Sequence, residues 1–250
     1  MLTEPHHTRV PALSRSILTV RPGDTLYPPG VRHWLAWTRR DGLFGTDDGC
    51  AGPALSLVGD AGLLSRTSVG LLCSVRCPGR IVLSAYDFAR KTPQDGAVII
   101  GGFHSPMERT CLQTLLARHV PVIYCPARRL HERGIPRAWD AALAEQRLLI
   151  LSPFVGSQRR VTRDLARQRN LLIAALATVL FVPYALRGGN TEAVVRLRLH
   201  SGMPVCTLED GENEHLMGLG VRGFAVAELP GMARPGEARS PFRESGKGLV

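Results

Sequence analysis

Arg169-Asn170 combines the two side-chain types in this sequence best suited to contact a nucleic acid. The pair follows a basic segment and precedes the apolar run Leu171–Ala177. A guanidinium offers a fork of N–H donors that fits phosphate oxygens, and an amide can contact phosphate and base edges. A solvated arginine face is the alternative, but the apolar run that follows should be buried. We therefore predict that Arg169 and Asn170 are fixed by their buried neighbours and bind phosphate.

Two glycine turns offer backbone N–H groups to the same kind of ligand. Gly101–Ser105 and Gly188–Thr191 each follow an apolar run and precede a helical segment. Glycine lets the backbone approach a ligand closely, and a helix N-terminus attracts anions. His104 could donate to phosphate, act as a base, or serve as a structural hydrogen-bonding group. Asn190 or Thr191 is expected to cap the following helix.

A third loop places a hydroxyl and a guanidinium after a buried strand. Ser74 and Arg76 could bind phosphate there, and the alternative is an ordinary turn with a solvated arginine. The segment Ser105–Glu108 matches a capping box, so Glu108 is expected to cap its helix rather than to act as a catalytic base. The predicted phosphate- and nucleic-acid-binding residues are Ser74, Arg76, Gly101, Gly102, His104, Ser105, Arg169, Asn170, Gly188, Gly189, Asn190 and Thr191.

The candidate loops favour binding over catalysis. They contain few acidic residues, and the sequence has no Walker lysine motif, no full GxGxxG after a strand and no evident Ser–His–Asp arrangement. Six cysteines are scattered, mostly in apolar runs, so they are expected to be buried free thiols. Cys73 and Cys77 are four apart without a matching second pair, which is a weak zinc signal. No cofactor, metal or catalytic residue is predicted.

Strand-like apolar runs alternate with helical segments through residues 53–210. This alternation predicts right-handed crossovers and an α/β doubly wound, mostly parallel, Rossmann-like sheet. The run Ala54–Val58 is expected to be an edge strand. Residues 1–52 should form an irregular N-terminal arm, with one short helix from Val31 whose tryptophans pack on the main domain. Residues 211–250 should form a C-terminal extension that is partly flexible.

Charge and hydropathy narrow the class of partner. The chain of 250 residues has a formal net charge of +10, carried almost wholly by arginine. Such a balance suits a polyanionic partner, although a compositional bias of the genome is an equal alternative. The longest apolar run, Leu171–Leu186, is short for a bilayer span and contains Pro183. We expect a soluble, cytoplasmic protein without a membrane partner.

These loops, taken in order, resemble the DNA-processing protein DprA/Smf family, within the group that also holds the LOG-type nucleotide-binding proteins. The segment Arg169–Ala177 is similar to the family's Arg-Asn-Arg-x-Ile-Ala-x-Leu-Ser signature, with Leu171 in place of the second arginine. Leu72–Arg76 stands where the family has a Gly-Ser-Arg turn. Gly188–Thr191 resembles the Ser-Gly-x-x-Thr turn after the next strand.

The resemblance implies a non-enzymatic protein that binds single-stranded DNA in a basic pocket. The family hands such DNA to a recombinase during natural transformation, so a recombinase partner and a homodimer are also expected. The alternative is a LOG-like protein that binds or hydrolyses a nucleotide, as a phosphoribohydrolase of nucleoside monophosphates does. Gly188–Glu192 only approximates the LOG signature loop. A third reading is a scaffold with a degenerate pocket that binds a partner protein.

Overall fold

One mixed sheet organises the protein. The computed structural model describes residues 15–40, 52–154 and 161–225. In these ranges, nine strands lie in the order β1-β2-β6-β5-β4-β3-β7-β8-β9. Their bounds are β1 (Leu18–Val20), β2 (Leu55–Gly59), β3 (Ser68–Leu71), β4 (Val98–Gly101), β5 (Val122–Tyr124), β6 (Leu148–Ser152), β7 (Val179–Val182), β8 (Val205–Leu208) and β9 (Arg222–Phe224).

The seven strands from β6 to β9 are parallel to one another, and β1 and β2 join them as an antiparallel pair. Every residue of β3, β4, β6, β7 and β8 is buried, as expected for strands covered on both faces. The mostly parallel α/β fold predicted from the sequence is therefore confirmed.

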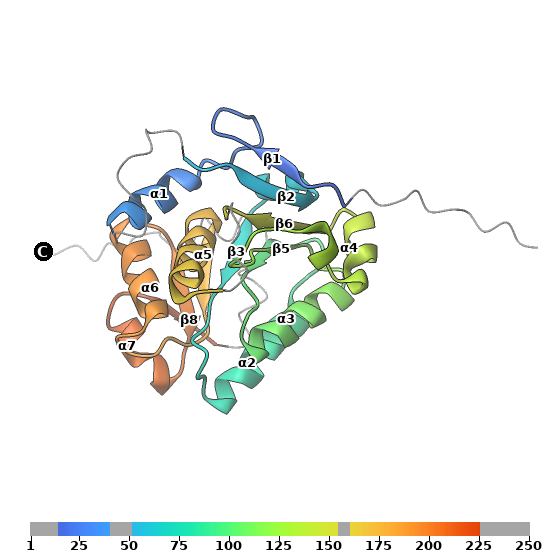
Figure 1. The fold of residues 1–250 in the computed structure, drawn as a ribbon. Coiled ribbons are helices and arrows are strands. Elements are labelled where there is room, and N and C mark those ends of the chain that lie inside the picture. The colour runs from blue at the N-terminus through green and yellow to red at the C-terminus, as the bar shows by residue number, and fades with distance from the viewer. Residues whose placement is uncertain (1–14, 41–51, 155–160, 226–250) are drawn as a thin grey trace, which may run out of the picture.

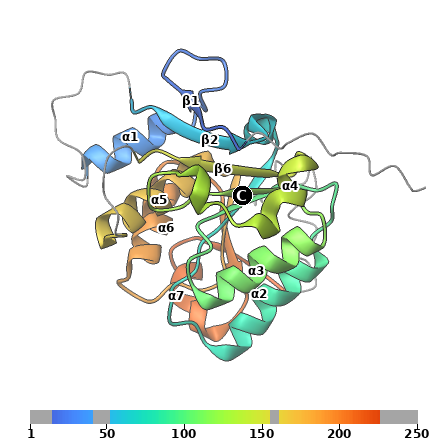
Figure 2. The same ribbon diagram turned by 45° about the vertical axis from the view of Figure 1, so that its right-hand side comes forward.

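Helices cover both faces of the sheet. They are α1 (Val31–Arg40), α2 (Gly79–Lys91), α3 (Pro106–Ala117), α4 (Asp140–Ala144), α5 (Arg163–Leu176), α6 (Asn190–His200) and α7 (Glu214–Met217). Figures 1 and 2 show α2, α3 and α4 on one side, and α1, α5 and α6 on the other. Each layer has its own apolar core against the sheet, one around Phe88 and Cys111, the other around Trp34 and Leu172. None of the helices in the described ranges is long and apolar enough to span a bilayer.

The strand order reverses at β3. The chain runs outward from β3 through β4, β5 and β6, then returns by α5 to place β7 on the other side of β3. The loops that follow β3 and β7 therefore turn to opposite faces of the sheet. The carboxyl ends of these two strands form a topological switch point, where ligands usually bind in open α/β sheets. The predicted binding residues lie on the loops around this switch point and on the returning helix α5.

The N-terminal arm is more ordered, in its described part, than its proline-rich sequence indicates. The predicted helix from Val31 is present as α1, and Trp34 is fully buried with its indole N–H donating to the carbonyl oxygen of Gln168 at 2.9 Å. The expected packing of this helix on the main domain is confirmed. The sequence analysis did not predict β1, which pairs Leu18 with Leu57.

The prediction that Ala54–Val58 is an edge strand was wrong. The strand lies second from the edge because the three residues of β1 pair along it. At the other edge, β9 extends the sheet from within the predicted C-terminal extension, pairing Thr207 with Gly223. Such short strands carry little pattern of their own and form because a neighbouring strand offers free hydrogen-bonding groups. The rest of the predicted C-terminal extension, residues 226–250, lies outside the described residues.

Candidate nucleic-acid interface

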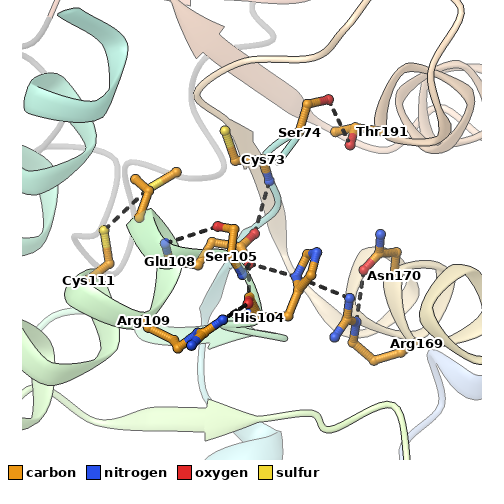
Figure 3. A network of polar contacts seen from close by, with 11 residues as sticks. Cys73, Ser74, His104, Ser105, Glu108, Arg109, Cys111, Arg169, Asn170 and Thr191 are labelled. Carbon is orange, nitrogen blue, oxygen red and sulfur yellow. Dashed lines mark hydrogen bonds and ion pairs between the residues drawn. The ribbon is translucent and has the colours of Figure 1, made fainter. Parts of the chain in front are cut away.

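The candidate site is a set of loops at the carboxyl ends of β3, β4 and β7, with α5 beside them. Polar contacts join the loop after β3, the start of α3 and the middle of α5 into one network (Figure 3). A separate contact joins the loop after β3 to the start of α6, between the Ser74 and Thr191 hydroxyls at 3.3 Å. The structure thus brings side chains together from four elements that are far apart in the sequence.

The Glu108 carboxylate is the centre of the network. Glu108 and Ser105 form the predicted capping box at the start of α3, which confirms that interpretation. The same carboxylate also accepts the backbone N–H of His104 at 3.0 Å and that of Cys73 at 3.2 Å. The His104 ring Nδ1 lies 2.8 Å from it. Glu108 therefore fixes the loop after β4 to the loop after β3.

Electrostatics keep Glu108 ionised. The side chain is 1% exposed, and burial alone would raise the pKa of its carboxyl group. The hydrogen bond from His104, the charge of His104, the backbone N–H of Ser105 and the charge of Arg169 outweigh burial and lower that pKa. A carboxylate engaged by this many donors stabilises its loop and is poorly placed to accept a substrate proton.

Arg169 contacts the glycine turn after β4, although its residue lies in the middle of α5. A Cβ placed on Gly102 would be 2.5 Å from Cζ of Arg169, so the guanidinium occupies the space that a side chain would fill. Arg169 Nε donates to Asn170 Oδ1 at 2.9 Å, and Nη2 lies 3.3 Å from His104 Nδ1. No described residue is a hydrogen-bond partner of Nη1. The predicted guanidinium–amide pair therefore meets the Gly101–Ser105 turn.

Arg169 is almost fully buried, at 2% exposure. Burial lowers the pKa of its guanidinium, and the nearby Glu108 carboxylate opposes that shift. The group stays charged because the pKa of arginine is far above neutral. A buried, charged guanidinium that is held by Asn170 and faces a glycine turn is a positioning group.

Ser74 and the Gly188–Thr191 turn form the other side of the site. The Ser74 hydroxyl accepts the backbone N–H of Leu186 at 2.9 Å and is shared with Thr191. These contacts tie together the two loops that diverge at the switch point. Gly188 has φ +71°, a conformation that favours glycine. A phosphate contact by Ser74 stays a prediction.

The prediction that Asn190 or Thr191 caps the next helix was wrong. Gly189 is the N-cap of α6 and makes no side-chain cap. The buried Glu192 replaces that cap, since its Oε2 accepts the Gly188 N–H at 2.8 Å while Oε1 pairs with Arg196. The pattern of a carboxylate in the first helical turn was the signal for this arrangement.

The predicted residues differ in how much of each reaches the surface. Those that are exposed and can meet a ligand directly are Arg76, His104, Gly188 and Asn190. The partly exposed ones are Ser74, Asn170 and Gly189. The buried ones, which can act only through their neighbours or a backbone group at the loop surface, are Gly101, Gly102, Ser105, Arg169 and Thr191.

Arg109 is a candidate that the sequence analysis missed. It lies in the first turns of α3, is exposed, and donates from Nε and Nη2 to the carbonyl oxygen of His104 at 3.2 and 2.9 Å. A cation near a helix N-terminus opposes the helix dipole, and this unfavourable position was the signal that could have singled out Arg109. Arg109 adds an exposed arginine to the rim, beside Arg76 and the exposed His104.

The described ranges contain five of the six cysteines, all as free thiols. Cys73, Cys111, Cys125 and Cys206 are buried free thiols and Cys77 is half-buried, as predicted for the cysteines described. Within those ranges, no group of three or more His, Cys, Asp or Glu side chains could hold a metal ion. Cys50 lies outside them.

No family model matches the chain, and no curated protein matches it. Solved structures do. DNA processing protein A (DprA) from Streptococcus pneumoniae has a TM-score of 0.65 at 16% identity, covering 88% of this chain and 76% of that one. DprA from Helicobacter pylori, described by its single-stranded DNA binding mode, has a TM-score of 0.61 at 20% identity, covering 86% of this chain and 94% of that one. The protein therefore has a DprA/Smf-like fold.

Proposed function

We propose that this protein, whose fold is DprA/Smf-like, binds single-stranded DNA along the carboxyl rim of its sheet and acts in DNA processing. The observation that carries the proposal is the contact of the Arg169 guanidinium with Gly102, inside a network that holds the loops after β3 and β4. A DprA with this fold is described as binding single-stranded DNA, which supports the assignment.

Phosphates are the part of the strand that the rim suits. Arg76, His104 and Arg109 present exposed donors, and the exposed Asn190 begins α6, whose N-terminus attracts anions. Arg169, being buried, would position the glycine turn whose surface meets the phosphate. The formal net charge of +10 favours a polyanion over a neutral ligand.

A binding role fits the chemistry better than a hydrolytic one. Glu108, the buried carboxylate at the centre of the site, is surrounded by hydrogen-bond donors and is not free to activate water. We extend the proposal to transfer of the bound strand to a recombinase and to a homodimer, as the family resemblance implies. The LOG-like alternative, binding or hydrolysis of a mononucleotide, becomes an outcome of the same experiment.

The test is a titration of a labelled oligo-dT with the full chain, followed by fluorescence anisotropy at several salt concentrations. We expect the logarithm of the affinity to fall linearly with the logarithm of salt, with a slope of about 0.7 per phosphate contacted. Arg76→Ala should weaken binding and reduce the slope by about one contact, because Arg76 is exposed and its loss removes charge without disturbing the core.

The matched control is Arg90→Ala, which removes an exposed arginine from the far end of α2 and should leave the affinity unchanged. Absence of oligo-dT binding at low salt would overturn the proposal. Displacement of the oligonucleotide by a free nucleoside monophosphate, with release of its base, would instead establish the LOG-like alternative.

A further inference from the structure

We propose that Cys73 and Cys77 are a thiol modification site, at which a low-molecular-weight disulfide converts the pair into a reversible disulfide that closes the loop after β3. The two residues enclose Ser74, Val75 and Arg76, the part of this loop that belongs to the candidate site. The thiol chemistry is independent of the proposed function, and only its effect on strand binding rests on that function. Where structural disulfides are rare, such bonds are usually transient and redox-sensing.

The two thiols lie in one chain of hydrogen bonds. The backbone N–H of Tyr184 donates to the Cys73 sulfur, and the Cys73 thiol donates to the Cys77 sulfur. The Cys77 thiol in turn donates to the carbonyl oxygen of Pro78, 3.7 Å away. The two sulfur atoms therefore already face each other, which is the first geometric requirement of a disulfide.

The surroundings of the two thiols give them different roles. Cys77 is half-buried, and the hydrogen bond from Cys73 lowers its pKa. Cys77 also stands directly before Pro78, the N-cap of α2, where the helix dipole favours a thiolate. Cys73 is 4% exposed, and its hydrogen bond to Cys77, followed by burial, raises its pKa. Cys77 is therefore the attacking thiol, and Cys73 is the resolving one.

The reaction is a two-step exchange with a disulfide RSSR, such as oxidised glutathione. The Cys77 thiolate attacks one sulfur, which forms a mixed disulfide and releases RS⁻, and RS⁻ takes up a proton. Cys73 then loses its proton and attacks the Cys77 sulfur, which forms the bond between the two cysteines and releases the second RS⁻, protonated in turn. The protein gives up two electrons and two protons, and RSSR gains them as two RSH.

The mixed disulfide prepares the second step. The largest cause of the raised pKa of Cys73 is its hydrogen bond to Cys77, and this hydrogen bond holds the proton because the partner is a thiolate. Once the Cys77 sulfur is bonded to R, it carries no charge. The resolving thiol then loses its proton more easily, so the intermediate should be short-lived.

Closure of the loop would act on Arg76. The Cys73 end is fixed, since its backbone N–H donates to the buried Glu108 carboxylate at 3.2 Å. Val75 and Arg76 are exposed, so the other end of the loop has room to move. Bond formation would draw Cys77 toward Cys73 and carry the adjacent Arg76 with it. Under the proposed function, a displaced Arg76 loses its phosphate contact.

The test treats the full chain with excess oxidised glutathione and measures its mass and thiol content. Cys50→Ser is introduced throughout, because that thiol lies outside the described residues. We expect the loss of two thiols and two hydrogen atoms, reversed by dithiothreitol. Trypsin cuts after Arg76, so the disulfide should join a peptide ending at Arg76 to one beginning at Cys77. A chain that keeps all its thiols would overturn the proposal.

Single variants separate the two roles. Cys73→Ser should stop at a stable glutathione adduct on Cys77, because the resolving thiol is gone. Cys77→Ser should form neither the disulfide nor an adduct on Cys73. The matched control Cys111→Ala removes another buried thiol and should still form the disulfide. A disulfide between any other pair, or an adduct on Cys73 in Cys77→Ser, would overturn the assignment.

Oligo-dT binding measures the consequence for the rim. Oxidation should lower the affinity and reduce the salt slope by about 0.7, the value for one lost phosphate contact. In Arg76→Ala, oxidation should have no further effect. Equal affinities of the oxidised and reduced chains would overturn the effect on the rim. If the reduced chain binds no oligo-dT, the proposed function fails, and the mass measurement still decides whether the disulfide forms.

Discussion

The Arg169 guanidinium fills the space above Gly102, and this contact explains why the position has no side chain. The guanidinium is buried and held by Asn170, so it cannot swing freely to make room. A methyl group at Gly102 would have to displace it. The glycine thus permits a close approach between two parts of the protein.

Gly102→Ala should lower the free energy of unfolding by about 1–3 kcal/mol, because it breaks hydrogen bonds of a buried charged group. Urea unfolding measures this change. The control Gly79→Ala adds the same methyl group where nothing lies within 4 Å, and it should not destabilise the protein. Equal stability of Gly102→Ala and wild type would contradict the packing described here. Oligo-dT binding should weaken only in Gly102→Ala.

The Glu108 carboxylate gives stability a specific pH dependence. Its pKa in the folded protein lies below the usual value for a glutamate, so its ionisation stabilises the fold above that usual value. This contribution is lost as the pH falls through the lower, folded-state pKa. Glu108→Gln cannot ionise and should cost about 1–3 kcal/mol at neutral pH, where an amide N–H₂ would face backbone donors.

Urea unfolding of Glu108→Gln and wild type at several pH values tests this prediction. The difference in unfolding free energy should be largest at neutral pH and should narrow as the pH falls below about 4.5. A difference that stays constant down to acid pH would show that the carboxylate's charge is not what holds the two loops.

At the level of elements, α5 and α6 are joined by one buried arginine. Arg198 of α6 is fully buried and donates to the carbonyl oxygens of Ala177, Thr178 and Pro204 at 2.9, 2.9 and 3.1 Å, and also to that of Ala174. Two of these carbonyl oxygens, those of Ala174 and Ala177, lie at the C-terminal end of α5. Carbonyl groups in the last turn of a helix have no following turn whose N–H groups could donate to them. The cation also faces the negative end of the α5 dipole. Burial lowers the pKa of Arg198 to about 10, so it stays protonated at neutral pH.

Arg198→Met should reduce the free energy of unfolding by about 3 kcal/mol or more, because several buried carbonyl oxygens lose their donor at once. Thermal and urea unfolding measure the loss. Arg90→Met, which removes an arginine side chain that is 65% exposed, should change stability by less than about 0.5 kcal/mol. Similar small effects of both substitutions would rule out this joint between the helices.

At the scale of the whole molecule, the reversal of strand order at β3 puts the candidate site where it is. Helices α2 to α4 take the chain away over one face, and α5 brings it back over the other. The loops after β3 and β7 consequently separate, and contacts such as that between Ser74 and Thr191 span the gap. Under the proposed function, the extended, charged strand would lie at this point of the sheet.

The sequence by itself determined the features that depend on a few neighbouring residues. The capping box Ser105–Glu108, the continuously apolar strands and the helix that carries Arg169 follow from hydrogen-bonding groups and periodicity within one or two turns. For the same reason, the alternation of strands and helices was enough to predict the parallel fold.

Only the tertiary structure decided which distant groups meet. The contacts of Arg169 with Gly102 and His104, of Glu108 with the Cys73 backbone, and of β1 with β2 depend on the strand order. Local pattern does not encode that order, because any buried apolar strand can pair with several others. The tertiary structure also decides how exposed each predicted residue is, because the packing of whole layers leaves Arg76 at the surface and buries Arg169.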